Sequence, residues 1–310
     1  MTLRPVQGTL PLTDECRHYD DLADVPPQLQ KYWHQRYSLF NFYDYDIRFT
    51  DDAWFGVTPE PVATQVAKHI TTAFFPHNPS QKPTPNPQES RPKPTTIIDL
   101  FAGVGGNTIA FALSEHWTHI IAIERDPSTL ACAQHNAAVY GIPEGVITWV
   151  LGDSLDFLGR LKSTFPSPTA GQGGEGQGEG GEEGGLDERL IVDPATTVLF
   201  ASPPWGGVEY RGQEVFDLET MEPYGLGVLY EACRPMACAL YLPRTSDLRQ
   251  VAGLVDGSSV NGSERGEGNG DDKGGSKGDG DGNGDGKIEV VQYCMEGASK
   301  AMVVYLPAES

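Results

Sequence analysis

From residue 95 onwards, short runs of apolar residues follow one another at intervals. They are rich in β-branched residues and have the length of buried strands. Strands that alternate with helical stretches predict a mostly parallel sheet covered on both faces, and the last two runs predict an antiparallel hairpin. We therefore predict an α/β fold with a seven-stranded sheet. The predicted strands are residues 95–100, 119–124, 146–151, 196–202, 237–243, 288–294 and 300–307.

Upstream of the sheet, the pattern is helical and aromatic. Apolar residues recur every four positions from Val62 to Phe74, which predicts one apolar stripe on a helix. Thr58 suits the N-cap of this helix. Residues 31–55 contain ten aromatic residues, and we expect most of these rings to lie in a core.

Composition divides the chain further. Residues 76–94 contain seven prolines and predict an extended linker. Two glycine-rich, acidic segments cannot bury enough apolar surface to become ordered, so we expect disordered insertions. The predicted divisions are an N-terminal segment that could be flexible (1–30), an extension (31–75), the linker (76–94), and a main domain (95–310) with insertions at 171–185 and 256–287.

The chain is strongly acidic, with 43 Asp and Glu against 22 Lys and Arg and a formal charge of −21. The two glycine-rich insertions carry −8 of this charge. Such a balance argues against a protein that holds nucleic acid by broad neutralisation of phosphates. The sequence contains no apolar run long enough to span a membrane and no CxxC pair, so we expect neither a membrane span nor a metal site.

A glycine-rich turn follows the first predicted strand. Asp99 ends the strand, and Gly103 and Gly105 precede a helix. Ligands of open α/β sheets bind at the carboxyl ends of the strands. A nicotinamide dinucleotide fingerprint needs a third glycine where this chain has Thr108. An acid at this strand end instead suits a cofactor with positive charges, such as the sulfonium and ammonium groups of S-adenosylmethionine.

Two more acids follow the next strands. Glu124 ends the second strand, nineteen residues after Gly105, where a carboxylate can accept from both ribose hydroxyls. Asp153 follows the third strand and could accept from the adenine amine. A lone glycine turn is more often an ordinary strand–helix connection, but three acids at successive strand ends favour a cofactor site.

The fourth strand ends in Ser202-Pro203-Pro204-Trp205. Two prolines cannot continue a sheet and hold the loop rigid. The pattern looks like the (Asp/Asn/Ser)-Pro-Pro-aromatic motif of methyltransferases that act on exocyclic amines of bases. There the loop accepts from the target amine, and the aromatic ring offers a stacking platform.

Five short sequence motifs occur in this chain in the same order as in the trimethylguanosine synthase family. The chain is similar to the catalytic domain of that family from about residue 31 to its end. The motifs are Lys31-Tyr32-Trp33-x-Gln35-Arg36-Tyr37, Trp54-Phe55-x-Val57-Thr58-Pro59-Glu60, Asp99…Gly103-Val104-Gly105-Gly106-Asn107-Thr108, Ser202-Pro203-Pro204-Trp205-Gly206-Gly207 and Leu242-Pro243-Arg244.

The resemblance implies a Rossmann-like class I fold and methylation of the N2 amine of the 7-methylguanosine cap, with S-adenosylmethionine as cofactor. It also implies stacking of the cationic base on Trp205 and contacts of Lys31 and Arg244 with the cap phosphates. From this resemblance and the acids at the strand ends, we expect the catalytic residues to be Asp99, Ser202, Pro203 and Trp205. The expected substrate-binding residues are Lys31, Trp205 and Arg244. The expected cofactor-binding residues are Phe40, Thr58, Asp99, Gly103, Gly105, Glu124, Asn136, Asp153 and Ser202.

The chain departs from the family pattern at three places. The family commonly has Asp where this chain has Glu124, which keeps both acceptor oxygens on a longer arm. Ala102 stands where the family has Cys, so no thiol is needed there. Val208-Glu209-Tyr210 replaces a frequent Pro-Asp-Tyr.

By the same resemblance, the substrates are capped small nuclear and nucleolar RNAs, the partners include proteins of their particles, and the location is the nucleus or nucleolus. We expect a monomer. A cap enzyme needs one cationic base and a few phosphates, so the acidic charge predicts recognition that ends near the cap. Two alternatives stay open: an amine methyltransferase with another base or a protein amide as target, and a cap-binding module that has lost transfer.

Overall fold

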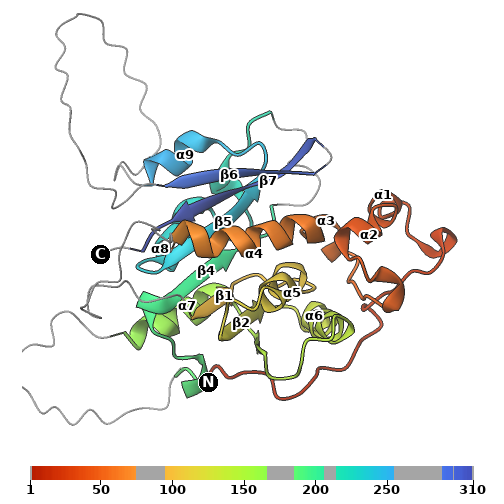
Figure 1. Cartoon of the computed structure of the whole chain (residues 1–310), viewed down its shortest axis with the longest axis horizontal. Helices are drawn as coiled ribbons and strands as arrows, with labels where there is room; N and C mark the ends of the chain where they lie inside the picture. Colours follow the sequence, from red (N-terminus) through yellow and green to blue (C-terminus); the bar gives the residue numbers. More distant parts are fainter. Residues whose placement is uncertain are drawn as a thin grey trace, which may run out of the picture.

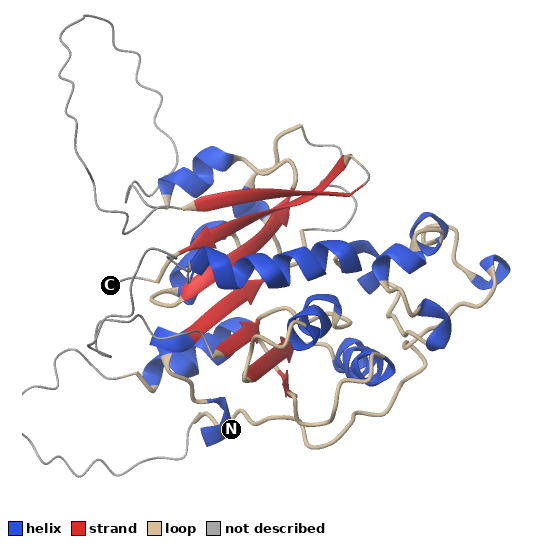
Figure 2. Cartoon of the chain, viewed as in Figure 1, coloured by secondary structure: helices blue, strands red, loops and turns tan. Residues whose placement is uncertain are grey.

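The computed structural model describes residues 2–74, 95–165, 185–205, 214–254, 288–295 and 297–308. A seven-stranded sheet lies at the centre, and helices cover both of its faces (Figures 1 and 2). The predicted linker at 76–94, the insertion at 256–287 and all but residue 185 of the insertion at 171–185 lie outside the described residues.

Each strand forms where a β-branched or aromatic run predicts one, because its side chains pack on both faces of a buried sheet. The strands are β1 (Thr96–Asp99), β2 (His119–Glu124), β3 (Ile147–Leu151), β4 (Thr197–Ala201), β5 (Ala237–Pro243), β6 (Glu289–Met295) and β7 (Ala298–Leu306).

The helices fall into a group before β1 and a group between the strands. The first group is α1 (Gln30–Trp33), α2 (Arg36–Leu39), α3 (Ala53–Gly56) and α4 (Glu60–Phe74). The second group is α5 (Gly106–Leu113), α6 (Pro127–Val139), α7 (Ser154–Ser163), α8 (Leu226–Cys233) and α9 (Leu248–Gly253).

The order of strands in the sheet is β3-β2-β1-β4-β5-β7-β6. β1 pairs in parallel with both β2 and β4, and only β7 runs antiparallel to its neighbours β5 and β6. The predicted mostly parallel sheet with a C-terminal antiparallel hairpin is confirmed. Because the connections leave β1 and β4 in opposite directions along the sheet, a crevice opens at their carboxyl ends.

Neighbouring residues of β1 belong to two different cores. Ile97 packs in a cluster with residues of α4, α5 and α6, whereas Ile98 packs in a cluster with residues of α7 and α8. Both side chains are fully buried. Because successive side chains of a strand point to opposite faces, β1 contributes to the core on each side of the sheet, as expected for a sheet that is covered on both faces.

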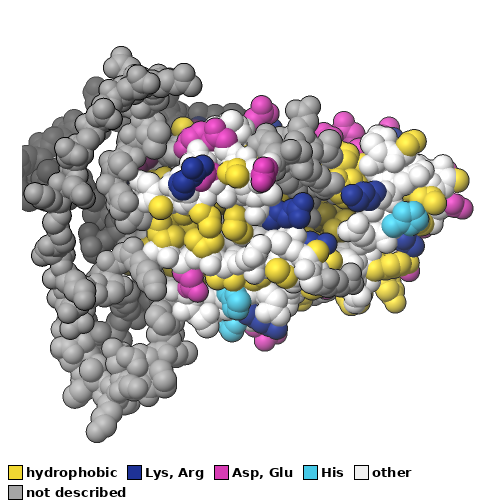
Figure 3. Space-filling model, turned by 90° about the horizontal axis from the view of Figure 1, so that it is seen from above, with side chains coloured by type: hydrophobic (Ala, Val, Ile, Leu, Met, Phe, Trp, Pro, Cys, Tyr) yellow, Lys and Arg dark blue, Asp and Glu magenta, His cyan; other side chains and the backbone are white. Residues whose placement is uncertain are grey.

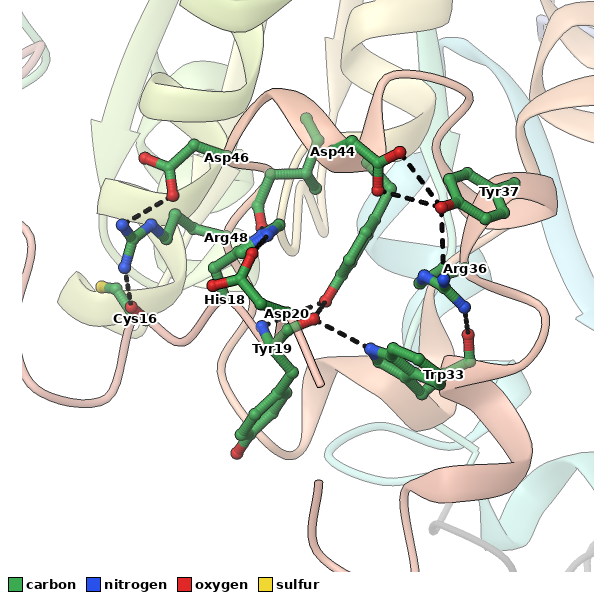
Figure 4. Close-up of polar contacts among 12 residues, drawn as sticks. Cys16, His18, Tyr19, Asp20, Trp33, Arg36, Tyr37, Asp44, Asp46 and Arg48 are labelled. Atoms are coloured by element: carbon green, nitrogen blue, oxygen red, sulfur yellow. Dashed lines mark hydrogen bonds and ion pairs between the residues drawn. The ribbon is translucent and has the colours of Figure 1, made fainter. Parts of the chain in front are cut away.

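The extension before α4 has an aromatic core of its own. Trp33, Tyr43 and Trp54 are buried, which confirms the expectation for most of these rings. The Arg36 guanidinium lies 3.7 Å from the centre of the Trp33 ring and donates to the Trp33 carbonyl (Figure 4). This stacked arginine joins α1 to α2, each of which is a single turn and could not persist alone.

Residues 2–30 pack against the rest of the molecule, whereas the sequence predicts a separate N-terminal segment over residues 1–30. Cys16, Val25 and Leu29 are buried, and the Cys16 thiol donates to the Ser128 carbonyl at 3.3 Å. The Trp33 indole N–H donates to the Tyr19 carbonyl at 2.9 Å. The extension therefore begins well before residue 31.

Three consecutive residues of α6 bind this extension. Gln134 accepts from the Leu10 amide at 2.8 Å, His135 contacts the Asp46 carbonyl at 2.9 Å, and Asn136 accepts from the Arg48 amide at 2.8 Å. Asp46 also forms an ion pair with Arg48 (Figure 4). Successive residues of one helix thus hold the extension onto the sheet domain.

Among the described helices, none combines the length and apolar character that a membrane span requires. The part of the chain that the structure describes also contains no cluster of three or more side chains able to hold a metal ion.

Candidate functional site

A cleft of about 1310 Å³ opens at the carboxyl ends of β1, β2 and β4. Most of the site residues predicted from the sequence line it, and they come from the glycine turn, the strand ends and the extension. Those residues are Thr58, Gly103, Glu124, Asp153, Ser202, Pro203 and Trp205.

The glycine turn between β1 and α5 is shaped by residues in the left-handed region. Gly103 and Gly105 have φ angles of 53° and 95°, which side chains with a Cβ rarely adopt. At Gly105, which precedes α5, an added Cβ would also lie 3.3 Å from Ile109. This turn brings backbone N–H groups and the start of α5 to the floor of the cleft.

Glu124 ties the turn to the end of β2. Its carboxylate accepts from the Gly103 amide at 3.0 Å and from the Arg125 and Asp126 amides at 2.8 and 2.9 Å. Burial raises the pKa of Glu124, and these three N–H donors partly oppose the rise. The side chain lines the cleft, so its oxygens border the space where a ribose would lie.

Asp153 lies one strand further along. Its carboxylate caps α7 by accepting from the Leu155 and Asp156 amides, and it accepts a short hydrogen bond from the Tyr224 hydroxyl. Burial acts to raise the pKa of Asp153, but these donors outweigh it and leave the pKa below its usual value. Tyr224 lines the cleft as well, and no sequence motif marks it, because it lies in a loop far along the chain.

Asp99 does not line the cleft. The carboxyl group is fully buried beneath the turn, where it accepts from the Thr108 hydroxyl at 2.6 Å and from the Phe101 amide at 3.3 Å. Burial raises the pKa of Asp99 to about 7. Its visible role is to hold the end of β1 against the first turn of α5.

The loop after β4 forms the opposite wall. Ser202 and Trp205 are half-buried and line the cleft. The Trp205 ring stacks on Tyr241 of β5, with ring centres 5.7 Å apart and an angle of 11° between the planes. Tyr241 is buried in the sheet core, so it holds the indole at a set orientation.

The extension supplies the roof through Thr58. Its hydroxyl accepts from the Asn107 side-chain amide at 2.9 Å. Asn107 lines the cleft and is 6% exposed, yet its Oδ1 has no hydrogen-bond partner among the described residues. A buried acceptor without a partner costs about 1–3 kcal/mol, which marks this position as one that a ligand or water would complete.

Two residues expected at the cofactor lie outside the cleft. Asn136 is fully buried, and its amide donates to the Arg48 and Val104 carbonyls at 2.9 and 3.0 Å. Phe40 lines a smaller cavity of about 220 Å³ on the other side of Gly106. Asn136 therefore joins the extension to the glycine turn, and Phe40 lies beside Gly106 at the start of α5.

Lys31 and Arg244, expected at the cap phosphates, are exposed. Lys31 lies on α1 and Arg244 directly follows β5, and neither is among the residues that line the cleft. Their contact with a phosphate stays a prediction.

The donor set fits S-adenosylmethionine. Carboxylates at the ends of β2 and β3 suit the ribose hydroxyls and the adenine amine, and the glycine turn leaves room for a backbone approach. The unpaired Asn107 oxygen is an acceptor for a polar group that the protein itself does not supply.

Comparison with known proteins supports the same reading. The model of the RNA cap guanine-N2 methyltransferase family matches residues 94–309. A trimethylguanosine synthase of Schizosaccharomyces pombe is 34% identical over 230 residues, which cover 74% of this chain and 76% of the relative. The trimethylguanosine synthase of Saccharomyces cerevisiae is 27% identical over 73% of this chain and 58% of its own length.

A solved structure of a protein from Porphyromonas gingivalis W83, classed as a methyltransferase, superposes with a TM-score of 0.50 at 14% identity. The match covers 92% of this chain and 51% of that protein. At this identity the likeness concerns the fold alone, and it agrees with the Rossmann-like class I layout.

Proposed function

The chain belongs to the RNA cap guanine-N2 methyltransferase family, and from this premise we propose that it methylates the N2 amine of a 7-methylguanosine cap. The observation that carries the proposal is that Trp205 and Ser202 share one cleft with Glu124 and the glycine turn. A base on the indole and a cofactor on the strand ends would meet in that space. S-adenosylmethionine supplies an electrophilic methyl group on its sulfonium.

Trp205 selects the substrate base. Methylation at N7 makes guanine cationic, and a cationic ring over an indole gains cation–π energy of about 2 kcal/mol when both are desolvated. Unmethylated guanine lacks this gain. Because Tyr241 orients the indole, the base would be held at a defined angle to the loop after β4.

The loop after β4 positions the attacking amine. The Ser202 side chain and the carbonyl groups at Ser202 and Pro203 are acceptors for its N–H groups, which directs the lone pair away from the loop. The amine would gain a positive charge as its bond to the methyl carbon forms and the bond from that carbon to sulfur breaks, with S-adenosylhomocysteine as the leaving group. The same oxygens would stabilise this charge, and water would take the proton that the amine then loses. Asp99, buried beneath the turn, would support this geometry by holding Thr108.

One experiment separates this function from its alternatives. The protein is incubated with labelled S-adenosylmethionine and with GTP, 7-methyl-GTP or adenosine, and the products are identified by mass. We expect transfer to 7-methyl-GTP only, with mono- and dimethylated products. Transfer to adenosine would indicate another amine as target, and binding without any transfer would indicate a silent cap-binding module.

The biological substrates proposed are capped small nuclear and nucleolar RNAs, and the proposed location is the nucleus or nucleolus. These assignments rest on the resemblance to the trimethylguanosine synthase family that the sequence motifs carry. Depletion of the protein should lower the trimethylguanosine content of these RNAs while leaving messenger RNA caps unchanged. An unchanged content would contradict this assignment.

A further inference from the structure

We propose that Tyr224 is a positioning residue, whose hydroxyl holds the Asp153 carboxylate so that its one open acceptor position meets the 6-amino group of the cofactor's adenine. This inference rests on the proposed function and deepens it, because it assigns part of the cofactor specificity to a residue outside the sequence motifs. The hydrogen bonds of Asp153, the anchoring of the Tyr224 loop and the charges around the pair lead to it.

The Asp153 carboxylate has most of its acceptor positions filled. Its Oδ1 atom accepts from the Leu155 and Asp156 amides at 2.9 and 3.0 Å, and its Oδ2 atom accepts from the Tyr224 hydroxyl. An ionised carboxylate offers about four such positions, so one remains on Oδ2. Asp153 and Tyr224 both line the cleft. A group that only accepts, with one position left, suits a single N–H of an exocyclic amine.

The loop that carries Tyr224 is anchored to α8. Leu226, which begins the helix, is fully buried, and the Glu219 carboxylate accepts from the Gly227 amide at 3.1 Å. Asp153 is the N-cap of α7, and α7 packs against α8 in one apolar cluster. The packing of these two helices therefore sets the place of the hydroxyl relative to the carboxylate.

The groups around Asp153 keep its carboxyl group ionised. Burial acts to raise the pKa of Asp153, and the Tyr224 hydrogen bond opposes this rise most strongly, followed by two backbone amides of α7 and by Arg125. Without the Tyr224 hydroxyl, the pKa of Asp153 would rise. Further charged groups on the elements around Asp153 are Glu124 in β2, Asp126 before α6, Asp156 in α7, Glu222 in the loop before α8 and Arg4 in the segment beside β3.

An acceptor held in this way distinguishes purines at position 6. Adenine offers an N–H there, whereas hypoxanthine carries a carbonyl oxygen, which the Asp153 lone pair would repel. A site built to pair with an N–H rejects an analogue that lacks it. Once the Tyr224 hydroxyl is removed, the carboxyl group is able to rotate and to take up a proton, and a protonated carboxyl group donates to that oxygen. Tyr224 would therefore sharpen the choice of adenine by acting through Asp153.

The test measures binding of two ligands by calorimetry on the full chain. They are S-adenosylhomocysteine and S-inosylhomocysteine, in which an oxo group replaces the 6-amino group. The parent should prefer S-adenosylhomocysteine by about tenfold or more. Tyr224→Phe should bind S-adenosylhomocysteine about fivefold more weakly and S-inosylhomocysteine no more weakly. On acidification from about pH 8 to pH 5, its binding of S-adenosylhomocysteine should begin to fall at a higher pH than in the parent, because Asp153 takes up its proton more readily.

Two further variants separate positioning from a general effect. The amide of Asp153→Asn is able to donate to an oxo group, so this variant should shift the preference towards S-inosylhomocysteine. Adding Tyr224→Phe to it should change the preference by less than about twofold, since the residue acts through Asp153. Tyr37→Phe is the matched control, because the Tyr37 hydroxyl also donates to a carboxylate, that of Asp44 at 3.0 Å, and neither residue lines the cleft (Figure 4). It should bind both ligands as the parent does.

Equal weakening of both ligands by Tyr224→Phe would show a merely structural role and overturn the inference. The same follows from unchanged binding of S-adenosylhomocysteine, from an acid dependence equal to that of the parent, or from a loss of equal size in Tyr37→Phe. A parent that binds both ligands equally well would also overturn it and leave the proposed function standing. If the parent binds neither ligand, the proposed function itself fails, which is a distinct outcome.

Discussion

At the scale of single residues, Trp205 is the side chain that we propose discriminates between a methylated and an unmethylated cap. It lines the cleft and rests on Tyr241. Trp205→Ala should lower kcat/KM for 7-methyl-GTP by roughly 30-fold or more, since a loss of about 2 kcal/mol corresponds to that factor. Binding of S-adenosylhomocysteine should persist. Trp205→Phe, which keeps an aromatic face, should retain part of the activity; full activity in the alanine variant would contradict the stacking role.

Asp99 makes the stability of the protein depend on pH. Burial raises the pKa of its carboxyl group from 3.8 to about 7, so the folded state holds a proton that the unfolded state releases. The stabilisation is fully present below about pH 4 and is lost as the pH rises towards 7. Asp99→Asn keeps an acceptor for Thr108 without the titration. We expect urea unfolding from pH 4 to 8 to show a smaller fall in stability for Asp99→Asn; parallel curves would contradict this assignment.

The sequence located several site residues because strand ends are visible in it. Glu124 and Asp153 follow apolar runs whose carboxyl ends must meet at one edge of the sheet, and both line the cleft. Tyr224 and Asn107 could not be assigned in the same way. Tyr224 lies in a loop far from any motif, and the role of Asn107 depends on the approach of Thr58, 49 residues earlier in the chain.

At the scale of elements, the turn between β1 and α5 depends on the left-handed conformation of Gly105. Its φ of 95° is strained for any residue with a side chain, and an added Cβ would crowd Ile109 and Ala133. Gly105→Ala should lower the free energy of unfolding by about 1–3 kcal/mol and weaken S-adenosylhomocysteine binding.

Gly159 in α7 provides the matched control for Gly105. It has no positive φ, and no atom lies within 4 Å of an added Cβ. Gly159→Ala should stabilise the protein by up to about 1 kcal/mol, because alanine favours helix more than glycine does. Similar stabilities of the two alanine variants would mean that the turn tolerates a side chain at position 105.

The contact between α6 and the extension also contributes to stability at the scale of elements. Asn136 makes three hydrogen bonds with the backbones of Arg48 and Val104, all of them buried or half-buried. Asn136→Ala should lower the free energy of unfolding by about 3 kcal/mol, because it leaves backbone groups unpaired. Amide exchange at Arg48 should also become faster.

Gln134→Ala serves as the comparison for Asn136, since the Gln134 side chain makes two hydrogen bonds, to the backbones of Gly8 and Leu10, instead of three. We expect Gln134→Ala to lower the free energy of unfolding by about 1 kcal/mol. If Asn136→Ala lowers the free energy of unfolding no more than Gln134→Ala does, Asn136 does not hold the extension more strongly than its neighbour in α6.

The elements themselves were more predictable than their contacts. Runs of β-branched residues have few alternatives to a buried strand, so all seven strands lie where the pattern places them, within one to two residues. The packing of residues 2–30 was not visible in the sequence. It depends on Ser128, Gln134 and similar polar residues of α6, which are more than 100 positions away along the chain.

At the scale of the whole molecule, the charge limits how RNA can be held. The net charge is −21. On the described part of the face in Figure 3, the Lys and Arg side chains form small, scattered groups and no single continuous patch. A strand of RNA laid across such a surface would find few cations in sequence. Recognition should therefore depend on the base in the cleft and on the phosphates nearest to it.

This reasoning yields a salt prediction. The logarithm of kcat/KM falls with the logarithm of salt concentration by about 0.7 for each phosphate of a single strand that is neutralised. A capped 20-nucleotide RNA and 7-methyl-GTP should therefore show similar slopes, and their KM values should agree within about threefold. Lys31→Ala and Arg244→Ala should each reduce the slope by about 0.7 for both substrates if they hold cap phosphates. A much steeper slope for the long RNA would reveal contacts beyond the cap and would contradict recognition that ends there.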